Sequence, residues 1–148
     1  MNQPTKGDTM NSTKRIALMF AACAVTTAAA FAGPRPPALT DSLLDAIRQV
    51  ESGGDDSAVG DGGRAIGPYQ IHRAYWVDAC AADPSLQSGT YADCFDPVYS
   101  RRVVVAYLSR YGRGCTAAQL ARIHNGGPRG HRKSATVEYA EKVLDAMK

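Results

Sequence analysis

Residues 40–54 read TDSLLDAIRQVESGG and combine an amphipathic helix with an abrupt stop. Either Thr40 or Asp41 suits the N-cap, because its side-chain oxygen can accept a hydrogen bond from a free backbone N–H group. Apolar residues then recur at helical spacing, namely Leu43, Leu44, Ile47 and Val50. The pattern predicts a helix that ends near Glu51, where a Ser-Gly-Gly sequence stops it.

Glu51 stands at the end of this predicted helix, on the face of Ile47 and Val50. The helix C-terminus carries partial negative charge, and the apolar neighbours would desolvate a carboxylate. Both effects disfavour the anion, so we expect Glu51 to keep its proton near neutral pH. A protonated carboxylic acid is what glycosidic bond cleavage needs, because the leaving oxygen must be protonated. A surface glutamate at a frayed helix end fits the position equally well.

The segment after the helix is rich in glycine and carries three aspartates, Asp55, Asp56 and Asp61. Asp61-Gly62 is a hairpin turn pair, so we expect a long loop or a small β-hairpin within residues 52–71. A compact domain seldom uses so long a loop unless the loop has a function. Glycosidases commonly pair a protonated carboxyl group with an ionised one, and glycine neighbours would leave Asp61 solvated and ionised. Taken alone, Asp61 fits an ordinary turn better than a catalytic role.

The remaining sequence predicts four more helices. One spans Ile71 to Ala82, and another opens with Asp96 as N-cap and Pro97 as first helical residue and runs to about Tyr111. A capping box at residues 116–119 starts a helix to about His124, and Thr136 caps the last one. The fold class is therefore all-α, or mainly helical α+β, with about five helices.

The first 32 residues predict a secretory signal peptide. Lys14 and Arg15 precede an apolar run that ends in Ala30-Phe31-Ala32, a small-x-small cleavage pattern. A membrane anchor or lipid attachment at Cys23 are the less favoured alternatives. Residues 33–39 form a proline-rich linker and residues 40–148 the domain. We therefore expect a secreted or periplasmic protein with no stable membrane insertion after the signal is removed.

Charge and cysteine content narrow the function further. The signal segment holds three of the 17 basic and one of the 14 acidic side chains, which leaves the rest of the chain at +1. A nucleic-acid partner is therefore not supported.

Cys80 and Cys94 flank a loop and are the favoured disulfide pair, worth about 3 kcal/mol, while Cys115 is either a buried thiol or an intermolecular one. No cysteine or histidine spacing indicates a metal site, and no cofactor is expected.

Several motifs in order resemble the invertebrate-type (destabilase-like) lysozymes, within the lysozyme-like superfamily. They are VESG at residues 50–53, Asp61, GPYQI at 67–71, YWVDAC at 75–80 and HNGGPRG at 124–130. The resemblance runs from about Leu44 to Tyr139. The part around Glu51 and Gln70 is also shared with the soluble lytic transglycosylases, and the HNGGPRG stretch separates the two families.

The resemblance implies a role for each matching residue. Glu51 falls at the general acid and Asp61 at the second catalytic aspartate, although the segment up to Gly67 is about one residue short. One wall of the sugar cleft would be lined by Tyr69, Gln70 and Ile71, and the opposite wall by His124, Asn125 and Gly126.

The chain also departs from the family. Its few cysteines retain Cys80 and Cys94, while other family half-cystines are absent. The family's serine-rich segment after the aspartate is replaced by GGRA at residues 62–65, so an isopeptidase activity is not carried over.

The resemblance implies a bacteriolytic, antimicrobial muramidase. It would hydrolyse β-1,4 bonds of the peptidoglycan glycan strand, its expected partner, with retention of configuration. A lytic transglycosylase that uses Glu51 alone, a non-catalytic peptidoglycan-binding module and an isopeptidase are the alternatives.

Overall fold

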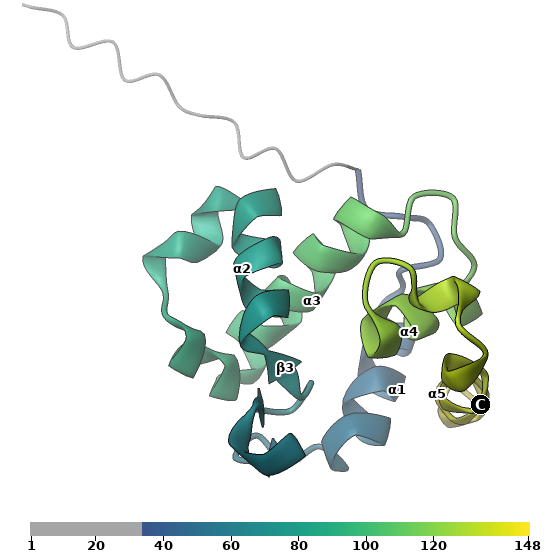
Figure 1. Cartoon of the computed structure of the whole chain (residues 1–148), viewed down its shortest axis with the longest axis horizontal. Coiled ribbons are helices and arrows are strands. Elements are labelled where there is room, and N and C mark those ends of the chain that lie inside the picture. The colour runs from purple at the N-terminus through teal and green to yellow at the C-terminus, as the bar shows by residue number, and fades with distance from the viewer. Residues whose placement is uncertain (1–33) are drawn as a thin grey trace, which may run out of the picture.

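The computed structural model describes residues 34–148, so the predicted signal peptide, Cys23 and Gly33 lie outside the described residues. Figure 1 shows a mainly helical domain. Its α-helices are α1 (Asp41–Ser52), α2 (Arg73–Ala82), α3 (Pro97–Tyr111), α4 (Ala117–Gly126) and α5 (Val137–Ala146). Short 3₁₀ helices are η1 (Asp61–Gly63), η2 (Pro84–Ser88), η3 (Tyr91–Phe95), η4 (Gly130–Arg132) and η5 (Ser134–Thr136). The predicted five helices are confirmed.

The glycine-rich segment folds into a small antiparallel sheet in the order β1-β2-β3. Its strands are β1 (Val59–Gly60), β2 (Ala65–Ile66) and β3 (Ile71–His72). Asp61 and Gly62 turn the first hairpin, and both have positive φ, at 49° and 63°. The predicted hairpin is thus present, with a third strand added to it. Because Ile71 pairs with Ile66 in the sheet, α2 begins at Arg73 rather than at Ile71.

Most of the predicted helix starts are confirmed by their hydrogen bonds. Thr40 accepts from the N–H of Leu43 at 3.2 Å, and Asp96 caps α3 ahead of Pro97. The capping box at residues 116–119 is present. Thr136 is the exception, since its hydroxyl donates to the Gly130 carbonyl at 2.7 Å and makes no cap bond to α5. The prediction of a side-chain cap there was wrong, because the hydroxyl bonds the preceding loop instead.

The hydrophobic core joins α1, α3 and α4. Its fully buried side chains include Leu43, Leu44, Ile47, Val103, Val104, Leu108, Leu120 and Ile123. The apolar stripe predicted for residues 43–50 is thus the stripe that α1 turns inward, except that Val50 is only partly buried. Pro36 and Leu39 of the expected linker are also buried, so this end of it packs on the domain. Among residues 34–148, each helix is too short or too polar to cross a membrane.

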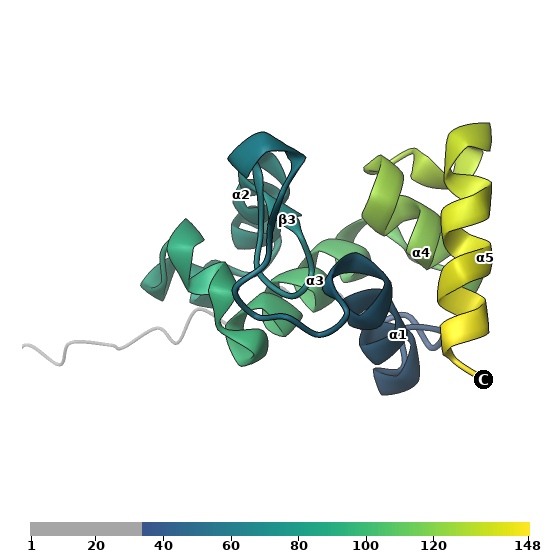
Figure 2. The ribbon, with the colours of Figure 1, turned by 90° about the horizontal axis from the view of Figure 1, so that it is seen from below.

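The domain has two sides, and the C-terminal end of α1 lies near both. Figure 2 shows α2 and β3 on one side, α4 and α5 on the other, and α3 between them. The contacts agree, since α2 packs on α3, α4 packs on α5, and α1 packs on α5. The C-terminal end of α1, which carries Glu51, therefore lies near both sides.

Candidate active site

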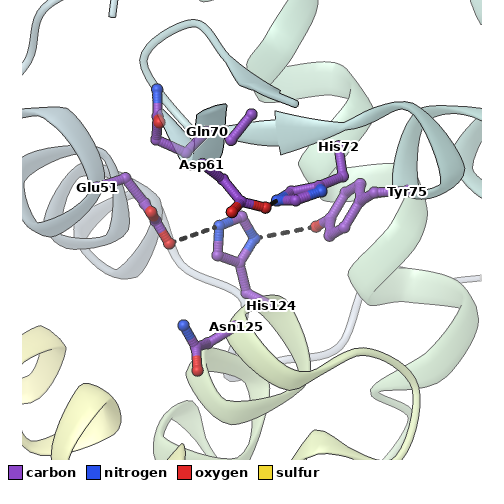
Figure 3. A pocket seen from close by; sticks show the side chains of 8 residues that line it. Glu51, Asp61, Gln70, His72, Tyr75, His124 and Asn125 are labelled. Atoms are coloured by element: carbon purple, nitrogen blue, oxygen red, sulfur yellow. Dashed lines mark hydrogen bonds and ion pairs between the residues drawn. The ribbon is translucent and has the colours of Figure 1, made fainter. Parts of the chain in front are cut away.

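A cavity of about 250 Å³ lies where these elements meet, and we call it the central cavity. Figure 3 shows that its side chains come from α1, the sheet, α2 and α4. The lining residues are Glu51, Asp61, Ala65, Gln70, His72, Tyr75, His124 and Asn125. The two carboxylates singled out in the sequence therefore line one cavity.

Glu51 lies in the last turn of α1 and is held through one of its oxygens. Its side chain is 17% exposed. The hydroxyl of Tyr139, on α5, donates to Oε1 at 2.7 Å. The ring nitrogen Nε2 of His124 lies 3.3 Å from the same oxygen. Within residues 34–148 the other oxygen, Oε2, has no hydrogen-bond partner.

His124 links Glu51 to Tyr75. The histidine side chain is 4% exposed, and its Nδ1 lies 3.1 Å from the Tyr75 hydroxyl. Burial, with help from Tyr107 and Glu51, raises the pKa of Tyr75 well above its usual range, so the hydroxyl keeps its proton. We assign the tautomer from these contacts: Tyr75 donates to Nδ1, which leaves the N–H at Nε2, on the side of Glu51.

Tyr139 is a permanent donor to Glu51. Burial, and then the charge and hydrogen bond of Glu51, raise the pKa of Tyr139 far above its usual value. The hydroxyl therefore stays protonated at any pH at which the domain would work. Oε1 of Glu51 thus accepts one hydrogen bond from a group that keeps its hydrogen and lies 3.3 Å from His124 Nε2.

Asp61 has a different setting at the tip of the hairpin. Its side chain is 45% exposed, and Arg64 donates to Oδ1 at 2.7 Å. His72 places Nε2 3.5 Å from Oδ2. The cavity therefore holds one enclosed carboxyl group and one that is open to water and paired with a cation.

The six predicted wall residues divide into two groups. Gln70, His124 and Asn125 line the central cavity. Tyr69 and Ile71 are 1% exposed and belong to the core, which corrects their expected place in the cleft wall. Residues 67–70 form a turn in which Gln70 has φ 47°, and the Gln70 side chain lines the cavity while its two neighbours are buried.

Gly126 also lies away from the central cavity. Its carbonyl accepts from the Lys133 ammonium at 2.7 Å. A Cβ atom at this position would meet Thr136 Cγ2 at 2.6 Å, so glycine allows α4 to approach the loop before α5. The structure thus gives Gly126 a packing position rather than the cleft-wall position that we expected.

Four residues at the site were not predicted as site residues. Ala65, His72 and Tyr75 line the cavity, and Tyr139 holds Glu51 from behind. Alternation within β3 could have indicated His72, because its neighbour Ile71 is buried and His72 therefore falls on the opposite face. Tyr139 had no local signal, because it is 88 residues from Glu51.

The cysteines of the described chain are all free thiols in the structure. Cys80 and Cys94 are buried, and burial, with the nearby Cys80, raises the pKa of Cys94 to about 12. The predicted Cys80–Cys94 disulfide is therefore absent from this structure and stays a prediction for the exported protein. Counting free thiols in secreted protein tests it.

Within residues 34–148 there is also no His, Cys, Asp or Glu cluster that could hold a metal ion.

A second hollow adjoins the central cavity behind Glu51. It has a volume of about 390 Å³ and shares Glu51 and Asn125 with the central cavity. Tyr139 and Lys142 of α5 form its far wall. Glu51 therefore stands between two hollows, while Asp61 lines only one of them.

Sequence comparison gives the chain clear relatives. The family model described as Destabilase matches residues 40–146. Lysozyme 1 of Crassostrea virginica is 44% identical over 84 residues, which cover 53% of this chain and 43% of that protein. The lysozyme of Ostrea edulis is 38% identical over 113 residues, which cover 72% of this chain and 80% of that protein.

Two solved structures are similar to the domain. The Tapes japonica lysozyme matches with a TM-score of 0.60 and 29% identity, over 70% of this chain and 87% of that one. The Meretrix lusoria lysozyme, in complex with Aeromonas hydrophila PliI, gives 0.62 and 29%, over 72% and 88%. The predicted lysozyme-like fold is confirmed.

The match does not extend over the whole of every relative. The chain spans 43% of the Crassostrea virginica protein and 58% of the lysozyme of Magallana gigas. The family model nevertheless covers nearly all of the described domain, including both carboxylates and the HNGGPRG stretch. On this evidence the chain belongs to the destabilase family, the family of the invertebrate-type lysozymes.

Proposed function

We propose that this protein is a lysozyme, a glycoside hydrolase that cuts β-1,4 bonds between the amino sugars of bacterial peptidoglycan. The observation that carries the proposal is the pairing of Glu51 and Asp61 in one cavity, with one enclosed and the other open to water. Glycosidases that protonate the leaving group need this contrast between their two carboxyl groups. Lysozyme is the standard example of a glycosidase with one protonated and one ionised carboxyl group. The relatives named above are lysozymes.

Glu51 is the general acid, and its contacts select the oxygen that carries the proton. Tyr139 donates to Oε1 and the His124 ring nitrogen Nε2 lies 3.3 Å from the same oxygen, so the transferable hydrogen belongs on Oε2. In the first step this proton moves to the glycosidic oxygen as its bond to the anomeric carbon breaks. The resulting Glu51 carboxylate keeps the hydrogen bond from Tyr139, which stabilises its new charge.

Asp61 acts on the anomeric carbon from within the central cavity. Its carboxylate attacks that carbon, or stabilises the positive charge that develops there. Arg64 and His72 hold the two Asp61 oxygens in place. In the second step Glu51 takes a proton from water, and the hydroxide portion bonds to the anomeric carbon and releases Asp61. Two displacements retain the configuration.

The structure favours this reading over a lytic transglycosylase. A transglycosylase needs only the glutamate, whereas here an aspartate with its own cationic partners lines the same cavity. A non-catalytic wall-binding module would have no use for two carboxyl groups in contrasting settings. Product analysis distinguishes these: hydrolysis gives reducing ends, a transglycosylase gives anhydro-sugar ends, and an isopeptidase releases peptides from intact glycan.

The test is Glu51→Gln on purified peptidoglycan, with products identified by mass spectrometry. General acid catalysis is worth about 100- to 10,000-fold, so we expect lysis to fall by about 1,000-fold. Arg113→Ala is the matched control, because Arg113 is exposed and lines none of the described cavities. Lysis by the Gln variant at the wild-type rate, with an unchanged thermal midpoint, would contradict the proposal.

We further propose that the protein acts outside the cytoplasm after removal of residues 1–32. Peptidoglycan lies there, and the sequence of the first 32 residues has the features of a signal peptide. N-terminal sequencing of exported protein should begin at Gly33.

A further inference from the structure

A third hollow lies next to the central cavity, on the other side of His72. It has a volume of about 360 Å³, and His72 lines both hollows. We call it the arginine pocket because two guanidinium groups border it. Its lining residues are Gly63, Arg64, His72, Arg73, Ala74 and Tyr91.

The Tyr91 ring is a fixed wall of the arginine pocket. Its hydroxyl donates to the carbonyl oxygens of Ile71 at 2.7 Å and Arg64 at 2.9 Å. These bonds tie the ring to β3 and to the hairpin that carries Asp61. The ring, together with Gly63 and Ala74, gives the hollow small, mostly apolar walls.

The two arginines of this pocket are used differently. Arg64 is already paired with Asp61 at 2.7 Å. Arg73 is exposed and has its guanidinium carbon 5.7 Å from the centre of the Tyr91 ring. Within residues 34–148 its side chain makes no ion pair or hydrogen bond. Arg73 is therefore a cation that is oriented by an aromatic face and free to bind an anion.

We propose that the arginine pocket binds the peptide stem of the sugar held in the central cavity, with Arg73 pairing with a stem carboxylate. This rests on the proposed function. Every second sugar of peptidoglycan carries a lactyl group linked to a short peptide, which presents methyl groups and a free carboxylate. Small apolar walls suit the methyl groups, and a guanidinium suits the carboxylate.

The position of the arginine pocket identifies which stem it receives. Asp61 lines the central cavity and not the hollow behind Glu51, so the sugar whose anomeric carbon reacts belongs in the central cavity. His72 borders that cavity and the arginine pocket. A substituent of the reacting sugar that passes His72 therefore reaches Arg73. The pocket would make the enzyme prefer glycan that still bears its stems.

The experiment compares two substrates: peptidoglycan free of phosphate polymers, and the same glycan after an amidase has removed its stems. The readout is the ratio of kcat/KM for the first substrate to that for the second. We expect Arg73→Gln to lower this ratio about tenfold, and Arg73→Lys to lower it less, because lysine keeps the charge but loses the planar fork. Arg113→Ala should leave the ratio unchanged.

The possible outcomes separate this inference from the proposed function. If wild type cleaves both substrates and Arg73→Gln leaves the ratio unchanged, the stem-binding role is wrong and the lysozyme function stands. If wild type cleaves neither, the proposed function is wrong as well. A third substrate, cell wall that still carries phosphate polymers, tests the other possible anion. If Arg73→Gln lowers kcat/KM on this substrate but not on polymer-free peptidoglycan, phosphate is the ligand and the stem assignment is wrong.

Discussion

The end of α1 and the tip of the β1–β2 hairpin each present one carboxyl group to the central cavity, but they support it in opposite ways. Glu51 is 17% exposed, accepts a hydrogen bond from Tyr139 of α5 and lies 3.3 Å from the His124 ring of α4. Asp61 is 45% exposed and is held by Arg64 of its own hairpin and by His72 of β3. The comparison shows how one small domain can place two carboxyl groups in contrasting surroundings within one cavity.

The largest structural effect should come from breaking the hairpin side of this comparison. Gly67 has φ +73°, and a Cβ atom there would lie 1.9 Å from the carbonyl oxygen of Cys94. Its N–H also closes the hairpin on the Ala58 carbonyl at 2.9 Å. We expect Gly67→Ala to lower the free energy of unfolding by about 3 kcal/mol or more, measured by urea denaturation.

Gly114 provides the matched control for this substitution. It has φ +70° with open space around its Cβ position, so Gly114→Ala should cost only about 1–2 kcal/mol of backbone strain. Equal losses for the two alanine variants would show that the contact with Cys94 has no energetic weight.

Removing one donor sharpens the Glu51 side of the comparison. Tyr139→Phe deletes the hydroxyl that binds Oε1 at 2.7 Å and leaves His124, whose Nε2 lies 3.3 Å from that oxygen. We expect kcat to fall about tenfold, the equivalent of about 1.4 kcal/mol. Tyr139 does not line the central cavity, so KM should change little.

The split between kcat and KM, measured together with the thermal midpoint, distinguishes positioning from a merely structural role. Tyr111→Phe is the control, because its hydroxyl bonds Asp78 outside the cavity. A wild-type kcat in Tyr139→Phe would leave Tyr139 no role in holding the acid.

The smallest expected effect concerns stability at alkaline pH. Burial raises the pKa of Tyr75 and of Tyr139, so both stay protonated when folded and ionise more readily when unfolded. Their stabilising contribution is therefore complete below about pH 10 and is lost as the pH rises above it. Tyr139→Phe should make the decline in unfolding free energy between pH 9 and pH 11 shallower, as followed by urea titrations. A steeper decline would contradict this sign.

The fold was largely predictable because the signals that specify it are local. The apolar stripe of residues 43–50, the Asp96-Pro97 start and the capping box at 116–119 each act within a few residues. The errors arose where a partner five or six residues away competed with the preference of the immediate sequence. Thr136 bonds the Gly130 carbonyl instead of capping α5, and Ile71 joins β2 instead of starting α2.

The site was predictable only in part. Glu51, Asp61, Gln70, His124 and Asn125 were identified from motifs, and the structure brings all five to one cavity. Motif order does not determine which side chains of a turn or a strand face outward, so Tyr69 and Ile71 were expected there too. Tyr139 and the Tyr75–His124 contact depend on how α2, α4 and α5 pack together, and no sequence pattern encodes that.

The most direct test of the central claim, that the two carboxyl groups have different tasks, is a substrate that needs no proton donor. A dinitrophenyl β-glycoside of an amino-sugar oligosaccharide loses its leaving group without protonation, so release of the phenolate can be compared across variants. Our account predicts that Glu51→Gln releases the first equivalent of phenolate within about tenfold of the wild-type rate while losing activity on peptidoglycan, and that Asp61→Asn loses activity on both. Because Glu51 also takes the proton from water in the second step, later turnovers of Glu51→Gln should be slow. Loss of the first phenolate release in Glu51→Gln, or its survival in Asp61→Asn, would contradict the assignment of acid and nucleophile.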